Sequence, residues 1–272
     1  MKESQVAVFV AWAAVLYIMQ NYKRDTLRGR RDEVVIVTSH FNEDLRWLKR
    51  SRYPVVVCDK PGARPMPFPA DPSCTLGVNR GQEASAYLQY IVANYDRLPG
   101  HVAFIHGHEK AWHQKLPMSM LEAIDRARID KYDFISLNGV QHSKIFSGSA
   151  VTNFPRRAQD VEVDHHAHRL LKRLWDLHLR PIFERPFPEH LRFPCCAQFI
   201  VSSRAIRRHP KEVYKRLLDM VLDPGNGDSR TVAIAMEWVW HMLFTASGPD
   251  MCEGEPPRKC TDSHFLQSWF TK

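Results

Sequence analysis

The sequence predicts an α/β fold, in which helices cover both faces of a mostly parallel, twisted sheet. The candidate strands are short and almost continuously apolar, such as VVIVT at 34–38. Runs of this kind are typical of parallel strands that are buried on both sides. Segments with helical spacing of apolar residues alternate with them, which is the pattern of α/β proteins. Polar residues follow the strand ends, where proteins of this class bind their ligands.

The first half of the chain is expected to contain four strands and two helices. The expected strands are 34–38, 54–58, 101–105 and 132–137. The longer helix covers 79–95, where apolar residues recur at helical spacing, and the shorter one covers 118–129. The proline-rich segment 61–72 is expected to be irregular.

The second half is expected to begin with a long polar loop or flap over 141–164, because this stretch shows no clear periodicity. A helix over 163–179 follows it. The strand 197–201 then leads to two helices, one that opens at Pro210 and one over 231–244.

The N-terminal segment is predicted to anchor the protein in a membrane. An apolar run over 6–19, extended by uncharged flanks, brings residues 1–22 near the roughly 20 residues that a spanning helix needs. A cleaved signal peptide is the alternative, but the run lacks a small-x-small cleavage pattern. Residues 23–32 would form a basic juxtamembrane linker, and residues 33–272 a single α/β domain. The side of the membrane stays open, because basic residues after the run favour the cytoplasm whereas a Golgi-type or ER-type enzyme needs the lumen.

Composition excludes some classes of partner. The net charge is +8, with basic residues spread along the chain, which suits anionic small molecules, phosphorylated donors or an anionic membrane. Nucleic acid is not expected, because no zinc-finger spacing, basic heptad or aromatic RNA-binding strand is present. None of the six cysteines forms CxxC, which argues against structural zinc. Cys252 and Cys260 could close a loop in an oxidising compartment, and six reduced thiols are equally compatible with this composition.

The strand ends supply the candidate binding residues. They are expected to converge on one crevice, and they are Asn42, Glu43 and Asp44, then Asp59, then His106 and His108, then Asn138. Capping of the next helix is an equally good interpretation of 42–44. Gln198, in an apolar strand, is expected to contact a ligand, because a buried amide needs partners. Asn79 and Glu83 are further candidates, and a place in the first turn of their helix is the alternative.

Glu237 is the most conspicuous residue of the last helix. It is the one carboxylate in the apolar stretch 231–244. Burying a lone carboxylate is costly unless a partner stabilises it. Glu237 is therefore either a satisfied core acid or a group whose pKa is raised for proton transfer.

Several segments resemble an uncharacterised family, number 3431 among the domains of unknown function. They are FNEDLRWL at 41–48, NRGQEASAYLQYIVANYDRLP at 79–99, VAFIHGH at 102–108, CAQFIVSSRAI at 196–206 with HPKEVYKRLL after it, and EWVWHMLF at 237–244. Two positions depart from the family pattern. His106 stands where such chains often carry glutamine, and Cys196 stands where a small residue is expected.

A looser resemblance implies an activity. The order of the AQFIVS strand, a basic helix with tyrosine and a helix with glutamate is similar to the acceptor-side half of GT-A type glycosyltransferases. This resemblance implies transfer of a sugar from a nucleotide-sugar donor to the hydroxyl of a glycan or another acceptor. Glu237 would be the base that deprotonates the acceptor, with a pKa moved toward neutrality. The likeness is one of fold alone.

The donor diphosphate is expected to be held without a metal. GT-A enzymes usually carry Asp-x-Asp for a divalent cation, and no such motif occurs in this chain. Imidazoles, as at His106 and His108, suit magnesium or manganese poorly. A basic side chain such as Arg80, Lys110 or Arg204 would then neutralise the departing diphosphate.

Two other classes of function remain open. One is a non-catalytic, membrane-anchored binding module. The other is a metal-dependent hydrolase with Glu109 or Asp164 and two histidine clusters, which are His101, His106, His108 and His113, and His165, His166 and His168. HExxH is absent, and chance clustering is the alternative explanation for these histidines.

Overall fold

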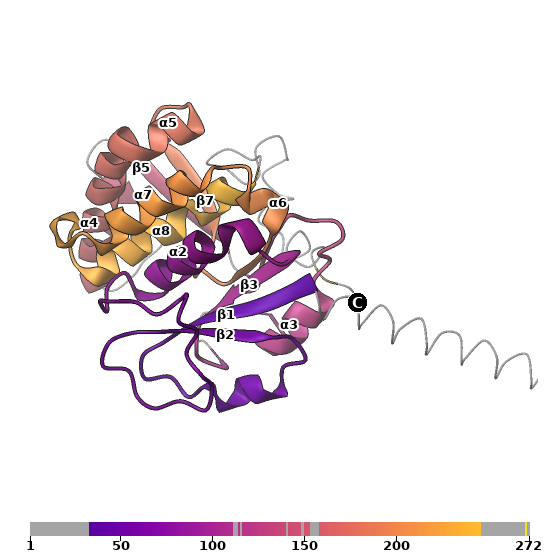
Figure 1. Ribbon diagram of the computed structural model, residues 1–272. Coiled ribbons are helices and arrows are strands. Elements are labelled where there is room, and N and C mark those ends of the chain that lie inside the picture. The colour runs from indigo at the N-terminus through magenta and orange to yellow at the C-terminus, as the bar shows by residue number, and fades with distance from the viewer. Residues whose placement is uncertain are drawn as a thin grey trace, which may run out of the picture.

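The computed structural model describes residues 33–110, 114, 116–139, 141–147, 150–152, 158–245 and 270. These residues form two sheets, with helices packed around the larger one (Figure 1). The strands of the larger sheet are β1 (Val34–His40), β2 (Val55–Asp59), β3 (His101–Ile105), β4 (Phe134–Ser136) and β8 (Phe199–Ser202). Their order across the sheet is β2-β1-β3-β8-β4.

The five-stranded sheet is mixed, which corrects the prediction of a mostly parallel one. β1 pairs in parallel with β2 and β3, whereas β8 is antiparallel to both β3 and β4. The apolar runs do form buried strands. An apolar run predicts that a strand is buried, but it does not predict whether the strand is parallel or antiparallel to its neighbours. An antiparallel strand that is covered on both sides has the same continuous apolar pattern as a parallel one.

Helical segments cover both faces of this sheet. One face carries α2 (Gln82–Asn94), α7 (Lys211–Leu222) and α8 (Ser229–Phe244), which lie side by side above β1 and β3 in Figure 1. The other face carries the 3-10 helix η1 (Leu45–Arg50) and α3 (Met120–Arg126). Successive side chains of β1 point to opposite faces of the sheet and so belong to two separate hydrophobic cores. Val37 packs in the core on the α2 side, and Ile36 packs in the core on the η1 side.

A second, three-stranded sheet replaces the loop expected over 141–164. It has the order β6-β5-β7, with β5 (Gln141–Ser147), β6 (Ala150–Thr152) and β7 (His190–Pro194). Both pairings are antiparallel. The prediction was wrong because β5 is rich in residues of low strand propensity, and because its partner β7 lies about forty residues later. The second sheet packs against α8, where the Phe193 and Trp238 rings lie 6.0 Å apart.

The remaining segments complete the helical layer. α4 (Ala158–Leu174) continues through a π-helical turn, η3 (Trp175–Leu179), into α5 (Arg180–Phe183). The expected helix over 163–179 is therefore confirmed but begins earlier. The short elements are η2 (Tyr95–Arg97), α6 (Ser203–Ile206) and η4 (Pro224–Asn226). Pro210 is the N-cap residue of α7 rather than part of its first turn.

The cysteines of the described residues pair. Cys58 at the end of β2 is bonded to Cys74, and Cys195 is bonded to its neighbour Cys196. Both disulfides lie in the interior. Cys252 and Cys260 lie outside the described residues, so their pairing stays a prediction.

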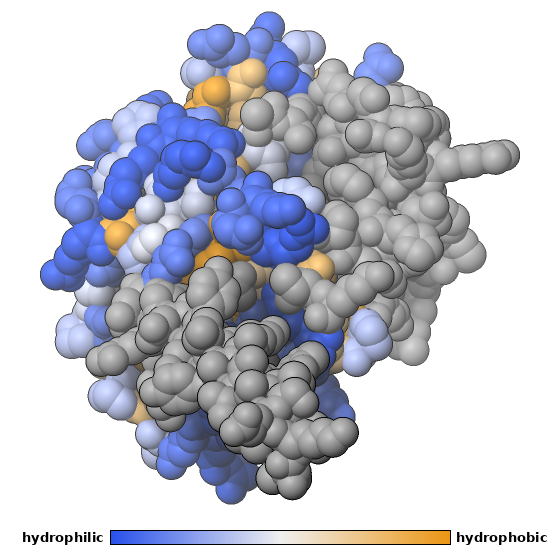
Figure 2. Space-filling view, turned by 90° about the vertical axis from the view of Figure 1, so that its right-hand side faces the viewer, coloured by the Kyte–Doolittle hydropathy of each residue, from blue (hydrophilic) through white to orange (hydrophobic). Residues whose placement is uncertain are grey.

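None of the described helices has both the length and the apolar character needed to cross a membrane. The predicted anchor 1–22 and the linker 23–32 lie outside the described residues. On the face shown in Figure 2, the described surface is mainly hydrophilic, with hydrophobic atoms in small separate patches.

Candidate functional site

The strand ends of β1, β2 and β3 do surround a cavity, of about 740 Å³. It is lined from the β1 end by Ser39, Phe41 and Glu43, from the β2 end by Lys60, from the start of α2 by Asn79, Gln82 and Glu83, and from the segment after β3 by His106, Gly107, His108 and Lys110. The lining thus carries two lysines, two glutamates and two histidines. Its position beyond the carboxyl ends of parallel strands is the usual ligand position in α/β sheets.

Five of the nine predicted site residues line this cavity. They are Glu43, Asn79, Glu83, His106 and His108. Asp44 lies in a neighbouring open hollow, and Asn42 is exposed beside the cavity without lining it. Gln198 is buried, and Glu237 lines a different internal space together with it.

Glu43 is fixed by the backbone of its own turn. Its Oε2 accepts hydrogen bonds from the N–H groups of Phe41 (2.7 Å) and Asn42 (3.0 Å). Burial opposes ionisation of Glu43, but the backbone hydrogen bonds and nearby His108 outweigh it, so the pKa is lowered. Gly107 allows the close approach of the two loops, because a Cβ there would lie 2.7 Å from the Glu43 Cβ. Glu43 is therefore an anion at neutral pH, held in place by the fold.

Asp44 caps the 3-10 helix η1, which is one of the two roles that the sequence suggested for residues 42–44. Its side chain accepts a hydrogen bond from the Arg46 N–H (3.0 Å) at the start of η1. It also forms a two-pronged ion pair with the Arg46 guanidinium, and this pair lowers the pKa of Asp44 to about 2. Of the residues at 42–44, one thus lines the cavity and another caps η1.

Lys60 is the most buried cation of the cavity, with 5% of its surface exposed. Its Nζ donates a hydrogen bond to the Gln82 carbonyl. Burial lowers the pKa of Lys60, while Glu83 and Glu43 act in the opposite direction. The carbonyl belongs to a strained turn, since Gly81 (φ 74°) and Gln82 (φ 47°) both have left-handed backbone conformations.

His106 is held by a buried amide. Its backbone N–H donates to Gln198 Oε1 (3.0 Å), and its Nε2 lies 4.0 Å from Glu83 Oε1. Burial, and to a smaller extent neighbouring His108, lowers the pKa of His106 to about 4 against the opposing effect of Glu43. The ring is consequently neutral at physiological pH.

Gln198 connects the cavity wall to the second internal space. Its Nε2 donates to Asn138 Oδ1 (2.7 Å), and Asn138 Nδ2 donates to the Cys195 carbonyl (2.8 Å). Each of these amide groups thus has a protein partner, as buried polar groups require. Within the contacts of the described residues, Gln198 supports the backbone under His106 and does not line the cavity.

Glu237 belongs to the same internal network. Its Oε1 accepts a hydrogen bond from the Cys196 N–H (2.9 Å). Cys196 (φ 80°) and Ala197 (φ 46°) form a left-handed turn between β7 and β8, so the carboxylate fixes a strained segment. The space that Glu237 lines has a volume of about 10 Å³, which holds one water at most. Its role as a base stays a prediction.

The basic residues proposed for a diphosphate lie in three different places. Lys110 lines the cavity. Arg80 donates to the carbonyls of Val221 (2.9 Å) and Gly227, which ties α2 to the end of α7. Arg204 pairs with Asp133 at 3.0 Å.

Lys60 is a cavity residue that the sequence analysis did not predict. It follows directly after β2, where ligand-binding residues are expected, but Asp59 was the candidate named at that strand end. Asp59 instead contacts His40, with 3.0 Å between Oδ1 and Nδ1.

The structure separates the first histidine cluster. His101 lies at the start of β3 beside Glu33 (3.6 Å), while His106 and His108 follow the other end of that strand. His113 and the side chain of Asp164 lie outside the described part of the chain. A three-residue arrangement of possible metal ligands among the described residues is Cys195, Cys196 and Glu237, within 4.8 Å. Two of its three atoms are the sulfurs of a disulfide.

The comparison with known families identifies the chain. No curated protein and no solved structure matches it. The model of the family described as "Protein of unknown function (DUF3431)" matches residues 35–263, from β1 to beyond α8, and so includes the whole cavity. The chain therefore belongs to the DUF3431 family.

Proposed function

We propose that this protein is a glycosyltransferase that moves a sugar from a nucleotide-sugar donor to a hydroxyl group of a glycan or similar acceptor. The observation that carries the proposal is the cavity of about 740 Å³ beyond the ends of β1, β2 and β3, with Lys60 and Lys110 in its wall. This volume lies within the range of small-molecule sites. Ligands of open α/β sheets bind at this edge, and we therefore name this space the donor cavity.

The charged groups of the donor cavity suit a diphosphate with sugars attached. Lys60 and Lys110 supply two ammonium groups, which would stabilise the negative charge that develops on a departing diphosphate. Glu83 in the first turn of α2 and Asn79 just before that helix also line the cavity, and both offer oxygen acceptors for sugar or ribose hydroxyls. The lysines would take the place of a divalent metal in this chain, which lacks an Asp-x-Asp motif.

Glu237 has a place in this proposal as a candidate base or as a positioning residue. Its contact with the Cys196 N–H favours the positioning role, because this turn leads directly into β8 and Gln198. Gln198 in turn holds the backbone of His106 in the cavity wall. The proposal also includes the predicted membrane anchor over 1–22, which would hold the enzyme at a membrane.

A thermal-shift screen of the full-length protein against UDP- and GDP-sugars tests the proposal. A true donor raises the unfolding temperature, since a ligand at 100 times its dissociation constant stabilises the native state by about 2.7 kcal/mol. Lys60→Gln should weaken donor binding by about tenfold or more, because glutamine keeps a hydrogen bond to Gln82 but loses the charge. Lys211→Gln, remote on α7 and paired with Asp96 (3.3 Å), is the control.

The outcomes separate the classes of function. Stabilisation by a nucleotide sugar together with release of nucleoside diphosphate supports a transferase. Binding with neither transfer nor hydrolysis would identify a binding module. If no nucleotide sugar stabilises the protein, the proposal fails.

A further inference from the structure

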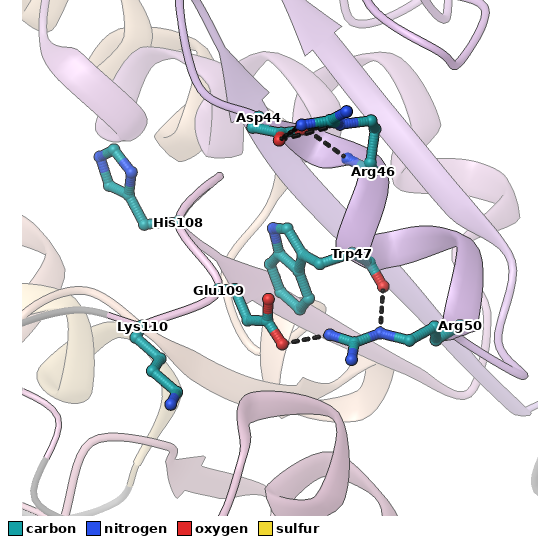
Figure 3. A pocket seen from close by; sticks show the side chains of 7 residues that line it. All are labelled: Asp44, Arg46, Trp47, Arg50, His108, Glu109 and Lys110. Atoms are coloured by element: carbon teal, nitrogen blue, oxygen red, sulfur yellow. Dashed lines mark hydrogen bonds and ion pairs between the residues drawn. The ribbon is translucent and has the colours of Figure 1, made fainter.

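A second, open hollow adjoins the donor cavity. It has a volume of about 590 Å³ and lies between η1 and the segment after β3 (Figure 3). Its floor is Trp47, whose indole Nε1 donates to the Gly107 carbonyl (2.8 Å) and so joins η1 to that segment. Trp47 is buried, with 7% of its surface exposed, and the hollow is open to solvent above it.

Four of the charged residues that line the open hollow form two ion pairs. Asp44 binds the guanidinium of Arg46, and Glu109 binds that of Arg50 (Figure 3). Arg50 is held in addition by a hydrogen bond from its Nε to the Trp47 carbonyl (3.3 Å). Each of the two carboxylates is thus paired with one guanidinium, and these exposed pairs offer both hydrogen-bond donors and acceptors to a ligand.

This arrangement fits a polyhydroxyl ligand better than an anion. A sugar hydroxyl both donates and accepts, so it can bridge a carboxylate oxygen and a guanidinium N–H of the same pair. An anion would have to compete with Asp44 and Glu109 for the two arginines. The small exposed part of Trp47, 7% of its surface, adds a limited apolar contact for the C–H groups of a sugar ring.

The two sites share a wall. His108 and Lys110 line both the donor cavity and the open hollow. The imidazole of His108 therefore lies at the junction of the two. An imidazole has a ring nitrogen that can accept a hydrogen bond and a proton, whereas the ammonium group of a lysine has donors only.

We infer that the open hollow is the acceptor subsite for a neutral glycan and that His108 is the catalytic base. The inference rests on the proposed function. The acceptor hydroxyl oxygen forms a bond to the anomeric carbon of the donor sugar, and its proton passes to the His108 imidazole. The bond from the anomeric carbon to the phosphate oxygen breaks, and its electron pair leaves with the nucleoside diphosphate. Lys110, beside both ligands, faces the charge on the leaving group.

The test uses the full-length protein, the donor found in the nucleotide-sugar screen, and the methyl glycosides of glucose, galactose and mannose as acceptor probes. Arg50→Ala should raise the acceptor KM by about tenfold or more and change the donor Kd by less than about twofold, because it removes one charge-assisted donor from the hollow alone. His108→Gln should lower kcat by about 100-fold or more, which is the usual size of general-base catalysis. Arg126→Ala, which breaks a similar exposed pair with Glu122 (2.6 Å) on α3, is the matched control and should change neither constant.

Failure of the inference can be told from failure of the proposed function. Donor binding by the wild-type protein with an unchanged acceptor KM in Arg50→Ala would overturn the acceptor subsite alone. The subsite is also overturned if Arg50→Ala weakens donor and acceptor equally, or if the protein transfers to none of the methyl glycosides although it binds a donor. Full kcat in His108→Gln would overturn the assignment of the base. Absence of donor binding in the wild-type protein would remove the proposed function and the subsite together.

Discussion

At the scale of single residues, the buried amide and imidazole side chains explain how the cavity wall keeps its shape. Gln198 was expected to contact a ligand, and its partners are instead the His106 N–H and Asn138. A buried amide was correctly expected to need partners, but its place in the sequence does not say whether these partners belong to the ligand or to the protein. That choice depends on contacts between β3, β4 and β8, which are distant along the chain.

The lowered pKa of His106 predicts a dependence of stability on pH. The pKa is about 4 in the folded protein and 6.5 in the unfolded chain, so the unfolded chain takes up a proton between these values that the folded protein does not. Protonation of His106 in the unfolded chain does not reduce the free energy of unfolding above pH 6.5. The free energy of unfolding decreases as the pH falls from 6.5 towards 4. Between pH 7 and pH 5 the free energy of unfolding should fall by about 2 kcal/mol on account of this group.

Urea unfolding of the wild-type protein and of His106→Gln at pH 7 and pH 5 measures this effect. Glutamine does not titrate, so the variant should lose less stability on acidification than the wild-type protein. Glu43 and Asp44 do not interfere, because their lowered pKa values place their effects below pH 5. Equal losses in the two proteins would show that His106 is accessible to protons in the native state.

At the scale of elements, a carboxylate on α8 is hydrogen-bonded to the turn that precedes β8, beside the aromatic packing of this helix on the sheet. Glu237 on this helix accepts the N–H of Cys196 in the turn before β8, and the turn has two consecutive left-handed residues. The sequence predicted the helix and singled out this acid. It could not predict the turn, because the pairing of β7 with β5 fixes where the preceding strand ends.

Substitution of Glu237 distinguishes a positioning residue from a base. Glu237→Gln should keep the fold and most of the sugar transfer, because its side-chain oxygen can still accept the Cys196 N–H. Glu237→Ala should lower the free energy of unfolding by about 1–3 kcal/mol, since the buried N–H loses its partner. Both are measured by denaturant unfolding and by the rate of nucleoside diphosphate release. A well-folded Glu237→Gln protein that transfers about 100-fold more slowly would instead identify Glu237 as the base.

At the scale of the whole molecule, the sequence predicted the location of the cavity better than the architecture that forms it. The rule that ligands bind at strand ends correctly brought Glu43, His106 and His108 together, because it needs only β1, β2 and β3 to be parallel. The direction of β8 and the existence of the second sheet depend on pairings between distant segments. Local periodicity contains no information on such pairings.

The disulfide between Cys58 and Cys74 joins the edge strand β2 to the end of the proline-rich segment and closes a loop with a sequence separation of 16. Lys60 of the donor cavity lies within this loop. A crosslink of this span restricts the unfolded chain and stabilises the native state by about 3 kcal/mol. Cys58→Ala and Cys74→Ala should each cost about this amount in denaturant unfolding. The double variant should cost little more than either single one, because the first substitution already breaks the bond. Two small and additive losses would mean that these sulfurs are not bonded in solution.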